Sequence, residues 1–217
     1  MYCQLLPTFQ HPFTSIIAGP TQSGKTTLVL KIIEYADGII EPSPDKIIYC
    51  YAIWQNAYEF IKQKCPRVEF MKGLLKLDDL SSSTKNLVII DDLMESCNKN
   101  DDINSLFTRH SHHMNTSVVH ITQNLFAQGK HSRTISLNCH YMIIMNNPRD
   151  RAQILALSRQ MYPTNPNFLM ECYEDATKDK YGYLFLDLKP TSKYRVQSGV
   201  FPDEKRIIYI EKDDTSR

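Results

Sequence analysis

The chain has 217 residues, of which 42% are hydrophobic and 23% charged, and its formal net charge is +1. This size and composition suit one ordinary globular domain and leave little room for a second. A net charge near zero argues against a protein that coats DNA non-specifically. No apolar run reaches the roughly 18 to 20 residues of a membrane span, and no signal peptide is apparent, so we expect an intracellular location, cytoplasmic or nuclear.

Short apolar runs alternate with amphipathic stretches along the chain, and this alternation predicts an α/β fold with a mostly parallel sheet. The expected strands are 13–18, 46–51, 68–71, 86–90, 117–122, 141–145, 183–188 and 206–210. The expected helices are 25–35, 56–64, 102–109 and 150–160, with a loop or short helix at 125–129. We therefore expect a single domain with its core at about 10–190, late C-terminal strands at about 183–210 and a tail at 211–217.

Eight residues match the phosphate-binding pattern G-x-x-x-x-G-K-[ST]: Gly19, Pro20, Thr21, Gln22, Ser23, Gly24, Lys25 and Thr26. An apolar strand is expected before them and a helix after them, which is the context that the motif requires. The glycines let backbone N–H groups turn toward phosphate oxygens, and the helix N-terminus adds its positive dipole. Lys25 is expected to reach the β- and γ-phosphates, and Thr26 to offer a hydroxyl to Mg²⁺. With Thr27 included, these residues predict ATP and Mg²⁺ as ligands.

A second motif is the apolar run 87–90 followed by two carboxylates, Asp91 and Asp92. At the end of a strand in a P-loop protein, the first acid holds Mg²⁺ and the second is the candidate general base. The strand expected at 46–51 intervenes in the sequence. We therefore expect the phosphate-loop strand and the acidic strand not to be neighbours in the sheet, with another strand between or beyond them.

The strand 117–122 ends in polar residues, and Gln123 is the candidate for contact with the γ-phosphate or its water, with Asn124 second. The alternative is a strand-end amide that caps a turn. Hydrolysis also needs positive charge on the transition state, for which Arg109, Arg133 and Arg149 are candidates because they follow the acidic strand and lie in a stretch without acids. The alternative for each of them is a structural or DNA-facing role.

The stretch 103–149 contains no Asp or Glu, although it carries four Lys or Arg residues and six of the seven histidines. Such a stretch is what a surface facing a polyanion would look like. The alternative is that several of these residues are interior. The basic members are Arg109, Lys130, Arg133 and Arg149.

Taken together, these motifs resemble the FtsK/HerA superfamily, most closely the genome-packaging ATPases of poxviruses, virophages and Polinton-type elements. The resemblance extends over about residues 10–202 and includes the Thr122-Gln123 strand tip, the segment 133–138, the Asn-Asn-Pro-Arg-Asp segment 146–150 and the run 183–190. It implies a three-layer, RecA-like P-loop core, a homo-oligomeric ring and ATP-driven pumping of double-stranded DNA into a capsid, with a capsid or portal component as partner. Many members of the wider superfamily have Glu as the second acid, whereas this chain has Asp92.

The leading hypothesis is therefore an ATP-hydrolysing DNA translocase, in which Asp92, Gln123, Arg133 and Arg109 act in catalysis and Thr26 and Asp91 hold Mg²⁺. A P-loop nucleotide kinase is one alternative, although such kinases usually lack paired acids together with a strand-tip glutamine. A GTPase-like switch is a second alternative, and a module whose bound ATP only sets its conformation is a third.

Overall fold

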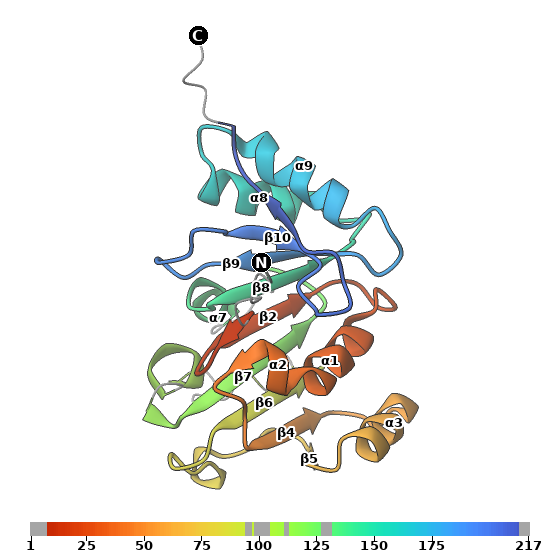
Figure 1. The fold of residues 1–217 in the computed structure, drawn as a ribbon, viewed down its shortest axis with the longest axis vertical. Coiled ribbons are helices and arrows are strands. Elements are labelled where there is room, and N and C mark those ends of the chain that lie inside the picture. Colours follow the sequence, from red (N-terminus) through yellow and green to blue (C-terminus); the bar gives the residue numbers. More distant parts are fainter. Residues whose placement is uncertain (1–7, 94–96, 98–104, 111–112, 127–131, 213–217) are drawn as a thin grey trace, which may run out of the picture.

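A nine-stranded sheet with helices on both faces forms the centre of the molecule (Figure 1). The computed structural model describes residues 8–93, 97, 105–110, 113–126 and 132–212. The strands are β1 (Phe9–Gln10), β2 (Thr14–Ala18), β3 (Ile40–Glu41), β4 (Lys46–Tyr51), β5 (Val68–Lys72), β6 (Asn86–Asp91), β7 (Thr116–Thr122), β8 (Tyr141–Met145), β9 (Tyr183–Asp187), β10 (Val196–Ser198) and β11 (Ile207–Tyr209). The helices are α1 (Lys25–Glu34), α2 (Ala36–Ile39), α3 (Asn56–Lys64), α7 (Ser132–Leu137), α8 (Arg151–Met161) and α9 (Pro166–Ala176), with a 3₁₀ turn η1 (Leu77–Asp79) and a π-helical segment η2 (Leu106–His110). None of the described helices is long and apolar enough to cross a membrane.

The strand order of the large sheet is β11-β10-β9-β8-β2-β7-β6-β4-β5. Pairing is parallel from β8 through β5, whereas β9, β10 and β11 add to the β8 side in antiparallel fashion. Strand β7 therefore separates β2, which leads into the phosphate loop, from β6, which ends in the acids. This confirms that the two motif-bearing strands are not neighbours, and β4 lies beyond β6 instead of between them.

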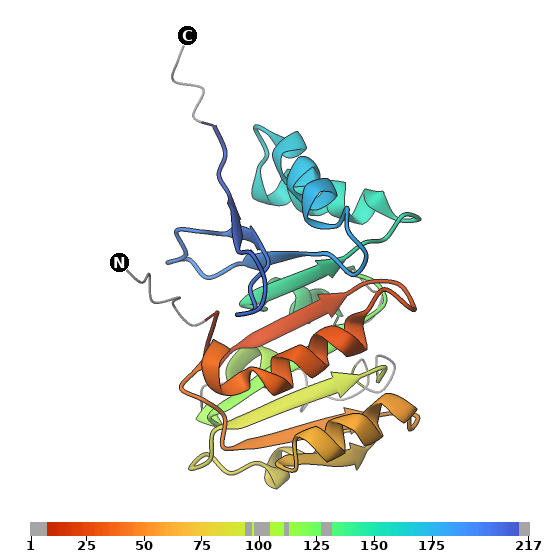
Figure 2. The ribbon, with the colours of Figure 1, turned by 45° about the vertical axis from the view of Figure 1, so that its right-hand side comes forward.

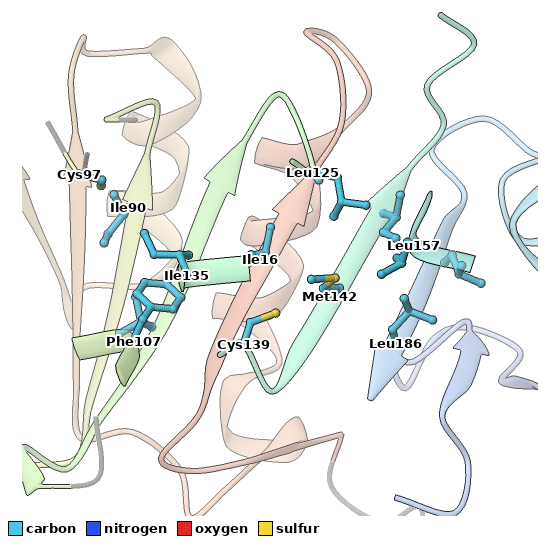
Figure 3. Packing of buried hydrophobic residues seen from close by; sticks show 14 of the residues in the cluster. Ile16, Ile90, Cys97, Phe107, Leu125, Ile135, Cys139, Met142, Leu157 and Leu186 are labelled. Atoms are coloured by element: carbon cyan, nitrogen blue, oxygen red, sulfur yellow. The ribbon is translucent and has the colours of Figure 1, made fainter. Parts of the chain in front are cut away.

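Helices α1, α2 and α3 cover one face of the sheet, and η2, α7, α8 and α9 pack on the other. Figure 2 shows α1 and α3 on the same side of the strands. On the opposite face, Ile16 and Met142 of the sheet lie among side chains from helices, such as Ile135 and Leu157 (Figure 3). Alternate residues of each buried strand supply the two cores, because side chains in a strand point to opposite faces in turn. The result is the expected three-layer α/β fold with a mostly parallel sheet.

Most expected elements are present, with ends shifted by one or two residues, but several elements were missed. Helix α9 follows Pro163 and begins at Pro166, a residue that suits the first helical turn although it breaks a helix elsewhere. Strand β10 has three residues, two of them polar, and it lies between β9 and β11, so the two expected late strands do not pair with each other. The part of the expected helix 102–109 before residue 105, and residues 127–129, lie outside the described residues.

The acid-free stretch 103–149 includes two strands that lie inside the sheet and do not face solvent. All residues of β7 and all residues of β8 are buried. Carboxylates are absent there for a simple reason, since a charge in the core without a partner is costly. Arg133 and Arg149 are exposed, while Lys130 and the side chain of Arg109 lie outside the described residues.

His120, in the middle of β7, predicts a pH-dependent stability. Its side chain is buried, its Nδ1 meets no hydrogen-bond partner among the described residues, and burial lowers its pKa to about 4. The unfolded chain takes up the proton near the ordinary pKa of about 6.5, whereas the folded chain resists it. The stabilisation is therefore complete above about pH 6.5, and we expect about 3 kcal/mol of unfolding free energy to be lost as the pH falls to about 4.

Chemical denaturation across this pH range, compared between the natural protein and His120→Leu, measures the contribution. Burial also lowers the pKa of His11, which destabilises both proteins as the pH falls. The contribution of His120 is therefore the difference between the two curves of unfolding free energy against pH. The exposed His113, changed to Asn, is the control and should leave the slope unchanged. Parallel curves for the natural protein and His120→Leu would contradict the prediction.

Candidate nucleotide-binding site

The phosphate loop connects β2 to α1 at the edge to which the parallel strands point (Figure 2). Gln22 and Gly24 have positive φ angles of 65° and 100°, which curl the backbone. Gly19 has no room for a side chain, because a Cβ there would lie 2.6 Å from Met145 Cβ and 2.8 Å from Ser23 Oγ. The sequence therefore needs glycine at both ends of the loop, at Gly24 for its φ angle and at Gly19 for close packing.

Lys25 is the first residue of α1, and its ammonium group is held at the loop. Its Nζ donates hydrogen bonds to the carbonyl oxygens of Gly19 and Pro20, each at 2.7 Å. Burial lowers the pKa of Lys25, while the charges of Asp91 and Asp92 act in the opposite direction. The structure thus places the lysine and both acids of the two motifs within one electrostatic neighbourhood.

Asp91, the last residue of β6, is 5% exposed and does not stand alone. Its Oδ2 accepts hydrogen bonds from the hydroxyls of Tyr49, at 2.7 Å, and Tyr58, at 2.8 Å. Burial first, and the charge of Asp91 second, raise the pKa of both phenols above their ordinary value. Both hydroxyls therefore keep their protons and act as donors. No sequence pattern pointed to these two tyrosines.

Asp92 differs from its neighbour in being exposed, and it has a φ angle of 53°. This left-handed backbone ends the strand and turns the chain away from the sheet. Asp and Asn are among the few residues that adopt it readily. Two adjacent carboxylates thus differ in environment, one buried and hydrogen-bonded and the other open to solvent.

Gln123 and Asn124 follow β7, the strand between the phosphate-loop strand and the acidic strand. The register pairs Thr122 with Ala18 on one side and Ile121 with Asp91 on the other. Both amides are exposed, and the hydroxyl of Thr122 donates to the carbonyl of Asn124. Because all three strands end at one level, Gln123 lies between the phosphate loop and the acids.

A cavity of about 690 Å³ opens at this edge of the sheet. Its lining residues come from the two motifs, the β7 tip and two further loops: Thr21, Gln22, Gly24, Lys25, Thr26, Thr27, Gln55, Asp91, Asp92, Ile121, Thr122, Gln123, Asn124 and Tyr181. The structure therefore brings Lys25, Thr26, both acids and Gln123 together in one cavity. Gln55, directly before α3, and Tyr181, before β9, were not expected, because nothing in their local sequence sets them apart.

Among the described side chains, no candidate arginine joins this group. None of the described residues that line the cavity is an arginine. Arg133 is exposed in the second position of α7. Arg109 lies in η2, packed near β7, with its side chain outside the described set.

The residues present fit a nucleoside triphosphate with Mg²⁺. Ser23 Oγ is buried inside the loop without a hydrogen-bond partner among the described residues, and this is a polar atom that the fold leaves unsatisfied at the loop. The hydroxyl of Thr26 and the carboxylate of Asp91 are the oxygen ligands that Mg²⁺ prefers, and both line the cavity. The volume lies within the range of about 300 to 1,000 Å³ typical of small-molecule sites.

Solved structures of other proteins have a similar fold. No protein-family model matches the chain, and no curated protein matches it. Among solved structures, it is similar to the DNA-packaging ATPase of Sulfolobus turreted icosahedral virus, with 10% identity, a TM-score of 0.56, and coverage of 87% of this chain and 97% of that one. The genome-packaging NTPase of Sulfolobus turreted icosahedral virus 2, solved in complex with ATP-gammaS, gives 11% identity, a TM-score of 0.50 and coverage of 86% and 96%.

The cytoplasmic domain of the Thermomonospora curvata type VII secretion ATPase is similar over 90% of this chain and 25% of that one, with 12% identity and a TM-score of 0.50. The chain therefore has the fold of the RecA-like P-loop ATPases. At these identities the likeness concerns the fold.

Proposed function

We propose that this chain is a Mg²⁺-dependent ATPase of the FtsK/HerA type that drives double-stranded DNA into a viral capsid. The observation that carries the proposal is the single cavity in which Lys25, Thr26, Asp91, Asp92 and Gln123 meet. The likeness to viral packaging ATPases over nearly the whole of both chains supports the same assignment. The poxvirus and virophage resemblance of the sequence motifs points in this direction too.

In this proposal, phosphate binding, Mg²⁺ binding, proton transfer and orientation of the water are assigned to different residues. The loop 19–26 and Lys25 bind the phosphates, while Thr26 and Asp91 hold Mg²⁺, which when bound neutralises phosphate charge. Asp92 is exposed to solvent within the cavity and takes the proton of the attacking water, and Gln123 orients that water. Thr27 and the remaining loop residues complete the nucleotide-binding surface.

The positive charge for the transition state comes from a neighbouring subunit in this proposal. The described lining of the cavity contains Lys25 but no arginine, and an arginine supplied by another subunit can contribute about 10³ to 10⁵ in rate. The exposed Arg133 is the first candidate, and Arg109 is the second. A homo-oligomeric ring, with a capsid or portal component as its partner, would present such an arginine to each site.

One short sequence pattern is a reason to compare ATP with GTP in any assay of nucleotide binding or hydrolysis. Residues 98–101 read Asn-Lys-Asn-Asp, the N-K-x-D order with which GTPases recognise guanine. They lie outside the described residues, seven positions after Asp91, and no apolar strand run immediately precedes them. We assign ATP as the nucleotide, and GTP is the competitor to test beside it.

Stimulation of hydrolysis by DNA tests the proposed function. Phosphate release from Mg·ATP should rise when long double-stranded DNA is added, with little dependence on DNA sequence. The effect should weaken steeply with salt, because binding to the phosphate backbone releases counterions. Lys130→Ala should reduce DNA affinity about equally for all sequences and lower the salt slope by about one.

Other outcomes would favour the alternatives. Transfer of phosphate to a nucleoside monophosphate, without DNA stimulation, would favour a nucleotide kinase. Nucleotide binding with neither hydrolysis nor transfer would favour a module whose conformation ATP sets. Preference for GTP over ATP would contradict the assignment of the base.

A further inference from the structure

The carboxylate of Asp91 is held from one side by two buried phenols. Tyr49 belongs to β4, the strand next to β6, and pairs with Ile89, two residues before Asp91. Tyr58 comes from α3, which covers this face of the sheet. Both hydroxyls donate to the same atom, Oδ2, and no described residue donates to Oδ1.

The rings that carry these hydroxyls are fixed by their neighbours. Tyr49 is 0% and Tyr58 is 1% exposed, and their ring centroids lie 4.9 Å apart. Phe70 lies 5.3 Å from Tyr49 and 5.7 Å from Tyr58, and Trp54 lies 5.4 Å from Tyr58. Close packing of this kind leaves the phenols little freedom to turn, so their hydrogen bonds set the orientation of the carboxylate.

The geometry points to Tyr49 and Tyr58 as positioning residues that make the metal site selective for Mg²⁺ over Ca²⁺. This inference rests on the proposed Mg·ATP site. With Oδ2 occupied by two donors, Asp91 offers a single oxygen, Oδ1, toward a cation. Mg²⁺ accepts one oxygen per carboxylate and retains several waters, whereas Ca²⁺ takes more ligands and often both oxygens of a carboxylate.

A purely structural role for the tyrosines would be different. Each buried hydroxyl needs an acceptor, and a backbone carbonyl would serve that need as well. A structural role therefore predicts a loss of stability when a hydroxyl is removed, with no change in which metal the site prefers. The positioning role predicts that metal affinity and metal preference change together.

The variants Tyr49→Phe, Tyr58→Phe and the double variant remove the hydroxyls and retain the packed rings. Tyr141→Phe is the matched control. Tyr141 is also fully buried, its hydroxyl accepts a hydrogen bond from the backbone N–H of Gln10, and it pairs with Ser15 at the start of its strand, away from the cavity. Each single variant retains one tyrosine on Asp91, so the test does not depend on folding of the double variant.

Mg²⁺ and Ca²⁺ are titrated separately into protein that holds a non-hydrolysable ATP analogue, and heat is measured by calorimetry. The fluorescence of Trp54, the only tryptophan of the chain, gives a second reading because its ring contacts Tyr58. We expect Mg²⁺ affinity to fall about 10-fold or more in each single variant. The preference for Mg²⁺ over Ca²⁺ should narrow, while analogue affinity without metal and the Tyr141→Phe control remain unchanged.

Two results would overturn the inference, and they can be told apart. If the natural protein binds the Mg²⁺-analogue complex and the Tyr49 and Tyr58 variants show the same Mg²⁺ affinity and the same preference, the tyrosines are structural and the proposed function stands. If metal has no effect on the natural protein, the Mg²⁺ site itself is wrong and both proposals fail.

Discussion

Lys25→Ala is expected to abolish nucleotide binding at working concentrations while leaving the fold intact. The ammonium group donates hydrogen bonds to the carbonyl oxygens of Gly19 and Pro20 in the loop. The Lys25 side chain is part of neither hydrophobic core. Removing a partly buried charge that pairs with a phosphate costs about 3 kcal/mol, which corresponds to a loss of about 100-fold or more in affinity.

Lys31→Ala is the matched control, because Lys31 lies on the same helix but pairs with Glu204 and Asp203. Thermal melts with and without Mg·ATP measure the effect, since a ligand at 100 times its Kd stabilises by about 2.7 kcal/mol. The natural protein and Lys31→Ala should shift, and Lys25→Ala should not. An equal shift in Lys25→Ala would remove this residue from the site.

Asp92→Asn is expected to retain nucleotide binding and to slow hydrolysis by about 10² to 10⁴, the range that general base catalysis contributes. The amide has the size of the carboxylate but cannot accept the proton of water. Asn also tolerates the φ angle of 53° at this position, so the backbone should not change.

Single-turnover hydrolysis measures the chemical step apart from binding. Asp78→Asn, an exposed acid outside the cavity lining, should retain the natural rate. Asp91→Asn should act differently, by weakening the response to Mg²⁺ concentration. Hydrolysis by Asp92→Asn at the natural rate would place the base elsewhere.

Local features of the sequence determined the fold class and the two motifs. The spacing of glycines and lysine in 19–26, with an apolar run before it and an amphipathic stretch after it, predicts a curled loop between a strand and a helix, and the structure has both. The apolar run before Asp91 is typical of a strand covered on both faces, and the structure has a fully buried strand there. These predictions succeeded because they depend on backbone geometry and on periodicity within a few residues.

Elements with weak local signals were not predictable in this way. Helix α9 begins at Pro166, and strand β10 contains Gln197 and Ser198. Their conformations are stabilised by packing, through Leu169 and Tyr173 on one element and pairing with two strands on the other. The acid-free stretch 103–149 similarly contains both buried strands and exposed arginines. Its composition alone does not show which of its residues are buried and which face solvent.

Only the tertiary structure decided which residues share the cavity. The sequence could place Asp91 and Gln123 at strand ends, but the order of strands puts β7 between β2 and β6 and thereby sets Gln123 between the loop and the acids. Gln55 and Tyr181 reach the cavity from loops that are far apart in the chain. Tyr49 of β4 and Tyr58 of α3 both donate hydrogen bonds to Asp91 at the end of β6, so three separate segments meet there. Contacts of this kind depend on how distant segments pack, and no pattern within one segment records them.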